Sequence, residues 1–322
     1  MDVEKKIAAI IGAGLIGRAW AVVFARAGWT VRLFDAAPAQ LSAARQSIAQ
    51  ALAEQEQAVM AADARAALDR IEPCIRVGDA VSDAAWVQEN LPEEVAIKRT
   101  AFAELDRLAS PDAILASSTS AIVASHFTAD LAGRARCLVA HPVNPPHLVP
   151  VVELCGAPWT SEATLDRARI TMTSLGQVPI IIRREIDGFV LNRLQGALLS
   201  EAMRLVADGV VAPDDLDKTI RDGLGLRWSF MGPFETIDLN APGGLADYCA
   251  RYSGLYRRLA TDPAPSSVWD KKSAERVAAA LGTPLTTAQR DQRTQWRDRR
   301  LLALRRHKLD IESQDDQPQD PQ

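Results

Sequence analysis

The alternation of apolar runs and amphipathic segments in the first half of the chain is typical of a parallel α/β sheet. A short apolar run from Ile7 ends in glycines, an apolar-periodic segment covers residues 15–27, and a second strand pattern (TVRLFD) ends at Asp35. This strand–turn–helix–strand order predicts the βαβ unit of a doubly wound sheet. Residues 38–70 are rich in Ala and Gln and carry apolar residues at helical spacing, which predicts a long helix or a helical hairpin.

Strand and helix patterns keep alternating until about residue 183. Further strands are expected at 86–90, 113–118, 137–143, 149–156 and 177–183, and further helices at 93–108 and 161–175. After Asp187-Gly188 the chain shows only helical patterns, with breaks at Gly209, Pro213 and Gly232-Pro233.

These patterns predict two domains and a tail. The first, at 1–187, is a doubly wound, Rossmann-type α/β domain, and the second, at 188–312, is an all-α domain. The acidic, Pro/Gln-rich end at 313–322 has no apolar anchor, and we expect it to be disordered.

Glycines follow the first predicted strand in the pattern GxGxxG, at residues 12–17. Gly12 would permit a tight turn, Gly14 the approach of the backbone to a pyrophosphate, and Gly17 the close packing of helix on strand. Asp35 would accept hydrogen bonds from the adenosine ribose and repel a 2′-phosphate, so NAD is expected rather than NADP. A purely structural turn is the alternative, which the flanking strands disfavour. The predicted cofactor contacts here are Gly12, Gly14, Leu15, Ile16, Gly17 and Asp35.

His141 and Glu153 flank a proline-rich segment, residues 142–150, between two predicted strands. Because prolines prevent regular ladder pairing, this segment must be a turn or loop. If the strands fold back on one another, the two side chains come close, and the carboxylate would fix the tautomer of the imidazole. Such a pair suits general base catalysis. From spacing alone, a hydrogen-bonded structural histidine is an equal alternative.

Two polar clusters strengthen the prediction of an active site. Residues 117–120 (SSTS) end a predicted strand, at the edge where a doubly wound sheet binds ligands. Residues 187–193 (DGFVLNR) begin the helical region, so Asn192 would face the same cleft. The alternatives are a turn or helix cap for the serines and a helix-start hydrogen bond for Asn192.

Together these motifs resemble the 3-hydroxyacyl-CoA dehydrogenase superfamily along nearly the whole chain. The segments most similar to its lambda-crystallin / L-gulonate 3-dehydrogenase branch are HPVNPP with VPVVEL, GFVLNRLQ, SEAMRLV, GLGLRWSFMGPFET and QWRD. The resemblance implies an NAD-dependent dehydrogenase that oxidises a CH–OH group.

The resemblance also implies roles for individual residues. His141 would take the proton of the substrate hydroxyl while hydride passes to the nicotinamide, and Glu153 would be its partner. Ser120 would hydrogen-bond the substrate oxygen near the cofactor, and Asn192 would help to hold the developing carbonyl. Asn144 would contact the nicotinamide end of the cofactor or support the His–Glu pair.

Glu93 and Lys98 match the cofactor contacts of the family's ENLxxK-like motif, although the run here reads PEEVAIK. Both would therefore touch NAD. Without the resemblance, the assignment would be an exposed salt pair at the start of a helix.

The charge of the predicted hairpin bears on the substrate. Acyl-CoA enzymes of the superfamily use this hairpin to hold CoA with basic residues. In this chain residues 40–72 hold no lysine and only Arg45, Arg65 and Arg70, against five acidic residues. Because a polyanion needs more positive charge, the sequence disfavours CoA. L-gulonate, oxidised to 3-dehydro-L-gulonate, is therefore the first hypothesis, with L-carnitine and 3-hydroxybutyryl-CoA as alternatives.

A small hydroxy acid needs one carboxylate anchor, and Arg227 is the candidate. Its guanidinium can bind a carboxylate through two parallel hydrogen bonds. A surface or interdomain ion pair is the alternative. Carnitine would need aromatic rings around its quaternary ammonium, for which Trp228 and Phe230 stand nearby.

Residues 290–308 are strongly basic. Their arginines would form the solvated face of a helix whose apolar stripe contains Trp296, Leu301, Leu304 and Leu309. A nucleic-acid role is the alternative, which the net charge of −4 and the lack of a binding module disfavour. A subunit contact fits better, because helical second domains of this superfamily commonly dimerise, and we expect a homodimer.

Composition narrows the remaining classes of protein. Of the 322 residues, 48% are hydrophobic and 24% charged, the ordinary balance of a globular protein with room for two domains. No apolar run is long enough to span a bilayer, and we see no targeting segment. The four cysteines lack CxxC spacing, so we expect reduced core thiols, no metal site and a cytoplasmic protein.

Three functions compete at this point. The first is an active NAD-dependent dehydrogenase of a small 3-hydroxy acid, with no nucleic-acid or membrane partner. The second is a structural or NAD-binding protein without catalysis, as the lens crystallin of this branch illustrates. The third is an acyl-CoA dehydrogenase. The joint presence of His141, Glu153, Ser120 and Asn192 favours an enzyme, because a structural role would not require all of them.

Overall fold

The structure is a computed structural model that describes residues 6–58 and 63–315. The chain divides into two compact units. The first unit consists of Met1–Asn192 and Trp296–Gln322, and the second unit of Arg193–Gln295. The last part of the chain thus groups with the first unit rather than with the helical region, and the domain boundary at 187/188 stays a proposal.

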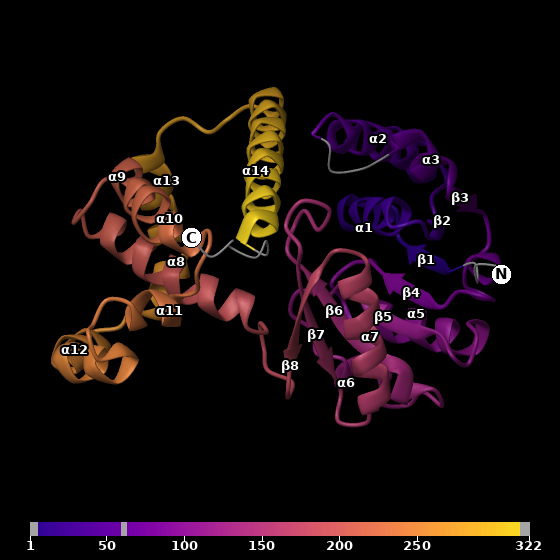
Figure 1. The fold of residues 1–322 in the computed structure, drawn as a ribbon, viewed down its shortest axis with the longest axis horizontal. Coiled ribbons are helices and arrows are strands. Elements are labelled where there is room, and N and C mark those ends of the chain that lie inside the picture. The colour runs from indigo at the N-terminus through magenta and orange to yellow at the C-terminus, as the bar shows by residue number, and fades with distance from the viewer. Residues whose placement is uncertain (1–5, 59–62, 316–322) are drawn as a thin grey trace, which may run out of the picture. The chain divides into compact units, whose positions relative to one another are not determined.

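An eight-stranded sheet forms the centre of the first unit (Figure 1). The strand order is β3-β2-β1-β4-β5-β6-β7-β8, and neighbouring strands are parallel except for β6 and β7. The strands are β1 (Ile7–Ile11), β2 (Thr30–Phe34), β3 (Ile71–Cys74), β4 (Trp86–Glu89), β5 (Ile114–Ser117), β6 (Cys137–Pro142), β7 (Val151–Gly156) and β8 (Val178–Ile182). The predicted Rossmann-type fold is confirmed.

Helices cover both faces of the sheet, and alternate residues of each strand point to opposite faces. Ala8 and Ile10 of β1 pack in a cluster with α1, α2 and α7, whereas Ile7, Ala9 and Ile11 pack in a cluster with α4, α5 and α6. Since both faces are covered, the strand has no polar side, which explains its unbroken apolar run. The helices are α1 (Leu15–Arg26), α2 (Pro38–Gln57), α3 (Ala64–Asp69), α4 (Val77–Val81), α5 (Val95–Leu108), α6 (Ser125–Thr128) and α7 (Glu162–Ser174), with a 3₁₀ turn η1 (Arg134–Arg136).

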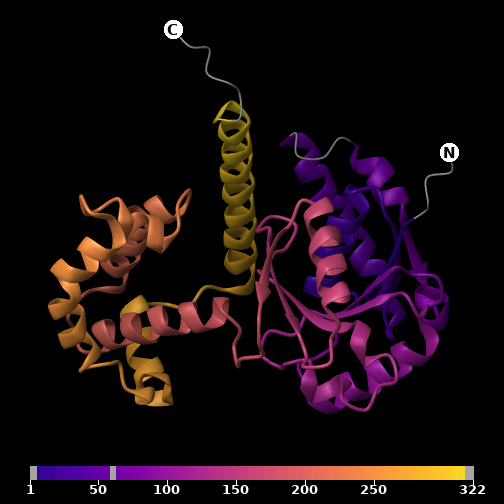
Figure 2. The same ribbon diagram turned by 60° about the horizontal axis from the view of Figure 1, so that its bottom comes forward.

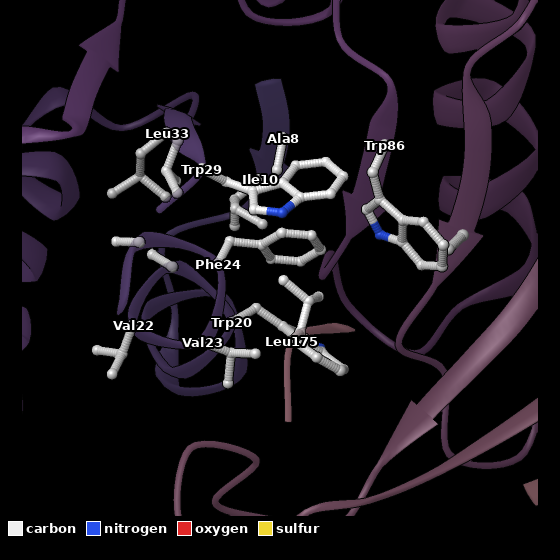
Figure 3. Close-up of a cluster of buried hydrophobic side chains, with 14 of the residues drawn as sticks. Ala8, Ile10, Trp20, Val22, Val23, Phe24, Trp29, Leu33, Trp86 and Leu175 are labelled. Atoms are coloured by element: carbon white, nitrogen blue, oxygen red, sulfur yellow. The ribbon is translucent and has the colours of Figure 1, made fainter. Parts of the chain in front are cut away.

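An aromatic cluster holds α1 against the sheet (Figure 3). The ring of Phe24 lies 5.2 Å from Trp29, 6.1 Å from Trp20 and 6.2 Å from Trp86, measured between centroids. Aromatic pairs at these separations add stabilisation beyond the burial of their surface. Because α1 begins directly after the glycine loop, this cluster also determines where the loop lies.

The predicted elements between residues 38 and 108 are largely confirmed. Residues 38–57 and 64–69 form two helices, α2 and α3, and a helical hairpin was one of the two forms expected. Strand β3 and helix α4 were not predicted from the sequence, because both are short and β3 has two exposed residues among its four. Helix α5 starts at Val95, two residues later than expected.

The second unit is helical throughout, as predicted for this region. The helices that lie within it are α9 (Pro213–Lys218), the π-helix η2 (Thr219–Leu224), α10 (Gly225–Trp228), α11 (Pro233–Asp238), α12 (Gly244–Ala260), the 3₁₀ helix η3 (Ser266–Trp269) and α13 (Lys271–Leu281). Helix α8 (Leu191–Ala207) begins two residues before this unit, and α14 (Thr287–Asp315) extends beyond its end. The predicted breaks are confirmed, since Gly209 has a φ of 71° after α8 and Pro213 and Pro233 open helices. Ala241 and Val268 are its buried hydrophobic residues, while Phe234 is 74% exposed.

The basic segment lies in α14, the long yellow helix of Figure 2. The prediction that one apolar stripe of this helix is buried is wrong. Leu302 is buried, whereas Trp296, Leu304 and Leu309 are 40%, 46% and 46% exposed. Arg305 and Arg306 are half-buried and donate hydrogen bonds to backbone carbonyls of the first unit. Leu301, the fourth member of the predicted stripe, is half-buried. The helix is therefore held by Arg305 and Arg306 together with the buried Leu302, and not by the predicted stripe as a whole.

Two smaller expectations are corrected. Residues 313–315, predicted to be disordered, belong to α14, and 316–322 lie outside the described residues. All four cysteines are free, but Cys249 is exposed and is not a core thiol. Burial raises the pKa of the Cys137 and Cys155 thiols to about 12, so both are unreactive at neutral pH.

Within the described ranges, no helix is long and apolar enough to cross a membrane.

Candidate active site

The predicted site residues of the first unit gather at one edge of its sheet. Gly12 follows β1, Asp35 follows β2, Ser120 comes three residues after β5, and His141 is the penultimate residue of β6. These strands are parallel to one another within the run β2-β1-β4-β5-β6, so their carboxyl ends share one edge. This is the edge at which doubly wound sheets bind ligands.

The glycine loop has the geometry that a dinucleotide requires. Gly12 has a φ of +95°, and an added Cβ would lie 2.8 Å from the carbonyl oxygen of Asn90. A Cβ on Gly17 would lie 1.8 Å from the carbonyl oxygen of Gly12, whereas a Cβ on Gly14 would meet nothing within 4 Å. Gly12 and Gly17 are thus required by the fold, and Gly14 leaves open space in which a pyrophosphate fits.

The start of α1 is prepared for an anion. Gly14 is its N-cap residue and provides no side-chain cap, so the N–H groups of the first turn stay available to a phosphate. Asp35 accepts hydrogen bonds from the N–H of Ala13 (2.8 Å) and of Ala37 (2.9 Å), which holds its carboxylate at the loop. Leu15 is exposed and Ile16 half-buried at the same helix start.

His141 and Glu153 are directly opposite one another in the antiparallel β6–β7 pair. His141 Nδ1 lies 2.7 Å from Glu153 Oε2, and the two residues are 5% and 1% exposed. The predicted contact is confirmed, because the strands fold back around the proline-rich segment as expected. The catalytic role of the pair stays a prediction.

The second oxygen of Glu153 anchors the start of α8. Oε1 accepts hydrogen bonds from the N–H of Val190 and of Leu191, each at 2.9 Å. Burial by itself would raise the pKa of Glu153, but the hydrogen bonds from His141, Leu191 and Val190 outweigh burial and lower it. Glu153 is therefore a carboxylate at neutral pH, and His141 Nδ1 carries the proton that it donates to Glu153.

Phe189, which the sequence analysis did not select, completes the surroundings of His141. Its ring centroid lies 5.4 Å from that of His141, and its side chain is fully buried. Its φ of 50° is in the left-handed region, which costs a bulky residue on the order of 1–3 kcal/mol. Together with Gly188 (φ 74°), this conformation turns the chain so that the next two N–H groups reach Glu153. The only sequence signal was the Gly-Phe pair after Asp187.

Ser120 and Asn192 are brought together, as predicted. The amide of Asn192 donates to the carbonyl oxygen of Ser120 at 2.7 Å. Glu93 holds the same segment, because Oε1 accepts hydrogen bonds from the N–H of Ser120 and of Ala121, both at 3.0 Å, and from the Thr119 hydroxyl. Burial would raise the pKa of Glu93, but these donors and Lys98 lower it.

Lys98 is not part of an exposed salt pair, so that alternative is wrong. Its side chain is 1% exposed, and Nζ lies 3.1 Å from both oxygens of Glu89 and 3.6 Å from Glu93. Glu89, which the sequence analysis missed, also accepts hydrogen bonds from the Leu91 N–H and the Ser117 hydroxyl. A charged residue at the end of an apolar strand was the available signal. Lys98 thus supports Glu93 from the interior.

Two predicted residues lie apart from these contacts. Asn144 is exposed in the loop between β6 and β7. Arg227 lies in α10 of the second unit and is also exposed.

A Rossmann-type sheet with a dinucleotide loop and a buried His–Glu pair defines an NAD-dependent dehydrogenase. Residues 7–186 match the model of the 3-hydroxyacyl-CoA dehydrogenase NAD-binding domain, and residues 188–279 that of the 3-hydroxyacyl-CoA dehydrogenase C-terminal domain. The chain belongs to the 3-hydroxyacyl-CoA dehydrogenase family and is an oxidoreductase that acts on CH–OH with NAD.

Similar proteins cover most of the chain. A lambda-crystallin homolog of Bos taurus is 44% identical over 92% of this chain and 94% of that protein. An L-carnitine dehydrogenase of a Pseudomonas species is 39% identical over 73% of this chain and 72% of that protein. The crystal structure of FHMPC 5-dehydrogenase, an NAD⁺-dependent dismutase, has a TM-score of 0.82 at 33% identity, with 94% of this chain and 98% of that chain covered.

Substitutions in the glycine loop should separate folding from cofactor binding. Gly17→Ala forces its Cβ against the Gly12 carbonyl, so it should lower both the Tm and the affinity for NAD, the latter about tenfold or more. Gly14→Ala has room for its methyl group and should keep the wild-type Tm while losing NAD affinity. Thermal unfolding and calorimetric titration with NAD measure the two effects. Gly78→Ala, whose Cβ also meets nothing, is the inert control, and equal NAD affinity in all three variants would exclude this loop as the cofactor site.

Proposed function

We propose that the protein oxidises the 3-hydroxyl of a small hydroxy acid, L-gulonate to 3-dehydro-L-gulonate. The buried hydrogen bond between His141 and Glu153 is the observation on which the chemistry rests. The resemblance to the lambda-crystallin branch supports the choice of substrate.

The tautomer of His141 makes it the base. Because Nδ1 donates its proton to the Glu153 carboxylate, the lone pair of Nε2 is available to accept the proton of the substrate hydroxyl. Once protonated, the imidazolium lies against the Glu153 carboxylate, which stabilises its charge. Bound NAD would supply the hydride acceptor for the carbon that carries this hydroxyl.

Ser120 and Asn192 are proposed to hold the reacting oxygen. The Ser120 hydroxyl has no hydrogen bond among the described residues, and Asn192 uses one amide hydrogen on the Ser120 carbonyl, which leaves the other for the substrate. For the cofactor, we propose Asp35 at the adenosine ribose, Glu93 and Asn144 toward the nicotinamide end, and Lys98 as support for Glu93.

The charge of the α2–α3 hairpin supports a small acid over a CoA ester. Arg45 and Arg70 donate to the carbonyl oxygens of Ile71 (3.4 Å) and Ala25 (3.3 Å), and Arg65 lies 3.1 Å from Asp69. Two of the guanidinium groups are thus held by backbone carbonyls and the third is paired with an aspartate, so few N–H donors of the hairpin are free to bind a polyphosphate. We propose Arg227 as the carboxylate anchor.

L-carnitine is the second candidate substrate, and one observation of the second unit favours it. Tyr248 stacks on Tyr256 at a centroid distance of 6.3 Å and contacts Tyr252 in a tilted arrangement at 4.6 Å. The hydrogen bond with Tyr256 raises the pKa of Tyr248, and the positive charge of Arg227 nearby opposes this rise. Aromatic faces beside a guanidinium suit a ligand with both a quaternary ammonium and a carboxylate.

We further propose a homodimer in the cytoplasm. The second unit buries few of its own apolar side chains, and large ones such as Leu226, Phe230 and Phe234 are exposed. An exposed apolar surface of this kind is normally covered, and a second copy of the chain is the partner with the same need. The free cysteines support a reducing compartment.

His141→Ala should abolish most turnover without affecting the cofactor. Loss of a general base lowers kcat by a factor on the order of 10²–10⁴. The Kd for NAD should change less than about twofold, because the glycine loop is untouched. Steady-state NADH formation and a titration with NAD measure both quantities. His126→Ala, on an exposed histidine, is the control, and near-normal turnover of His141→Ala would contradict the assignment.

A direct assay tests the substrate. The purified protein is supplied with NAD and with L-gulonate, L-carnitine or 3-hydroxybutyryl-CoA, and NADH formation is followed. We expect kcat/KM for L-gulonate to exceed that for the CoA ester at least about tenfold, because acidic residues outnumber basic ones in the hairpin and its arginines are already bound within the fold. Faster oxidation of the CoA ester would reverse the ranking, and carnitine turnover alone would favour the second candidate.

Light scattering after gel filtration tests the dimer. The expected mass is twice the 34.9 kDa of one chain. Phe234→Glu should lower the mass toward one chain, because a charge on an apolar interface is costly to bury. Ile75→Glu, at an apolar residue of the first unit that is even more exposed, should leave the mass unchanged, and a monomeric wild type would refute the proposal.

A further inference from the structure

The loop between β6 and β7, residues 143–150, has more hydrogen-bond acceptors than donors. Pro145, Pro146 and Pro150 have no N–H, so their peptide units contribute only carbonyls. Within the loop, the N–H groups of Leu148 and Val149 both donate to the Pro145 carbonyl at 2.9 Å. The carbonyls that follow need donors from elsewhere in the fold.

Side chains from three separate parts of the first unit supply these donors. Arg305 of α14 donates to the carbonyl oxygens of His147 (3.0 Å) and Leu148 (3.5 Å), and Arg26 at the end of α1 donates to His147 (2.9 Å). The side-chain amide of Gln177 faces two carbonyl oxygens, so its NH₂ group is assigned to this side and donates to Pro150 (3.0 Å) and Pro146 (3.3 Å).

The arginines are held here without a counter-charge. Within the described residues, neither Arg26 nor Arg305 forms a salt bridge, and their hydrogen bonds go to carbonyl and amide oxygens. Burial, with Arg305 nearby, lowers the pKa of Arg26 to about 9, and burial with Arg26, Arg305 and Arg297 nearby lowers that of His147 to about 4. Both pKa values show that adding positive charge here is unfavourable.

Two unpaired arginines held near one another lower the stability of the fold, so stability does not explain why they lie here. Bringing two guanidinium groups together away from water costs free energy, and carbonyl dipoles compensate only part of that cost. An apolar contact would dock α14 at lower cost. What the arginines add is direction, because the planar fork of Arg305 contacts His147, Leu148 and Gly176 at once.

We propose that Arg305 is a positioning residue of the active site, which holds the loop that joins His141 to Glu153 and carries Asn144. The inference rests on the proposed roles of His141 and Asn144. It gives the basic end of the chain a function inside its own fold, in place of a solvated face or a nucleic-acid contact.

Arg306 provides a matched control on the same helix. Its guanidinium donates to the carbonyl oxygen of Ala58 at 3.0 Å and pairs with Asp310 at 2.9 Å. It thus fastens α14 at the end of α2, and among the described residues it forms no hydrogen bond or ion pair with the loop. Removing Arg306 tests the docking of the helix, and removing Arg305 tests docking and loop position together.

The experiment compares Arg305→Met and Arg306→Met in the full chain. Both should lower the Tm, but only Arg305→Met should lower kcat, by about tenfold or more, because small displacements of groups near the reaction are costly. The KM for NAD should stay within about twofold of wild type, since the glycine loop is untouched. Hydrogen exchange should rise at Leu148 and Val149 in Arg305→Met alone.

Equal kcat values in the two variants, or unchanged exchange at Leu148 and Val149, would overturn the proposal. If Arg305→Met does not fold, Arg305→Lys decides, because an ammonium replaces the fork by a single point of contact. A kcat reduced about threefold or more with raised exchange is then expected, and wild-type values refute the role. The assay uses whichever substrate the wild type oxidises, so a failure of L-gulonate alone leaves this outcome readable.

Discussion

The carboxylate of Glu153 is the group on which the active site depends. It lies in the interior of the sheet, where an ionised carboxylate is stable only with full hydrogen bonding. Its three donors come from two places: His141 on the neighbouring strand, and the N–H groups of Val190 and Leu191 at the start of α8. One charge therefore fixes the tautomer of His141, the proposed base, and the entry of the chain into the helical region. The left-handed conformation of Phe189 persists because these hydrogen bonds compensate its strain.

A second buried charge organises the other half of the site in the same way. Glu89 at the end of β4 binds the ammonium of Lys98, which in turn lies near Glu93. Glu93 then accepts the N–H groups that hold Ser120. A buried ion pair of this kind contributes little net stability, but it fixes geometry when all of its partners are present. The cofactor contact that the resemblance implies for Lys98 is on this argument indirect, through Glu93.

The sequence was sufficient to predict those parts of the site whose geometry a local pattern of residues determines. The glycine spacing predicted the turn at Gly12, and a strand–proline–strand order predicted the contact of His141 with Glu153, because an antiparallel return allows few registers. It was insufficient for Lys98, since a Glu and a Lys near a helix start look the same whether exposed or buried. It also failed for Arg305, whose acceptors are backbone carbonyls more than a hundred positions away, at His147 and Gly176. Backbone acceptors leave no trace in the pattern of side chains.

Asp35 shows why cofactor choice and loop shape are not independent. Its carboxylate accepts the N–H of Ala13, inside the glycine loop, and of Ala37, at the start of α2. The loop conformation that Gly12 permits is thus stabilised by the same group that would meet the ribose. Replacing Asp35 to admit a 2′-phosphate would also remove a hydrogen bond that shapes the pyrophosphate site. A change of preference toward NADP in this fold therefore requires a substitute donor–acceptor arrangement at Ala13, and not only the removal of a negative charge.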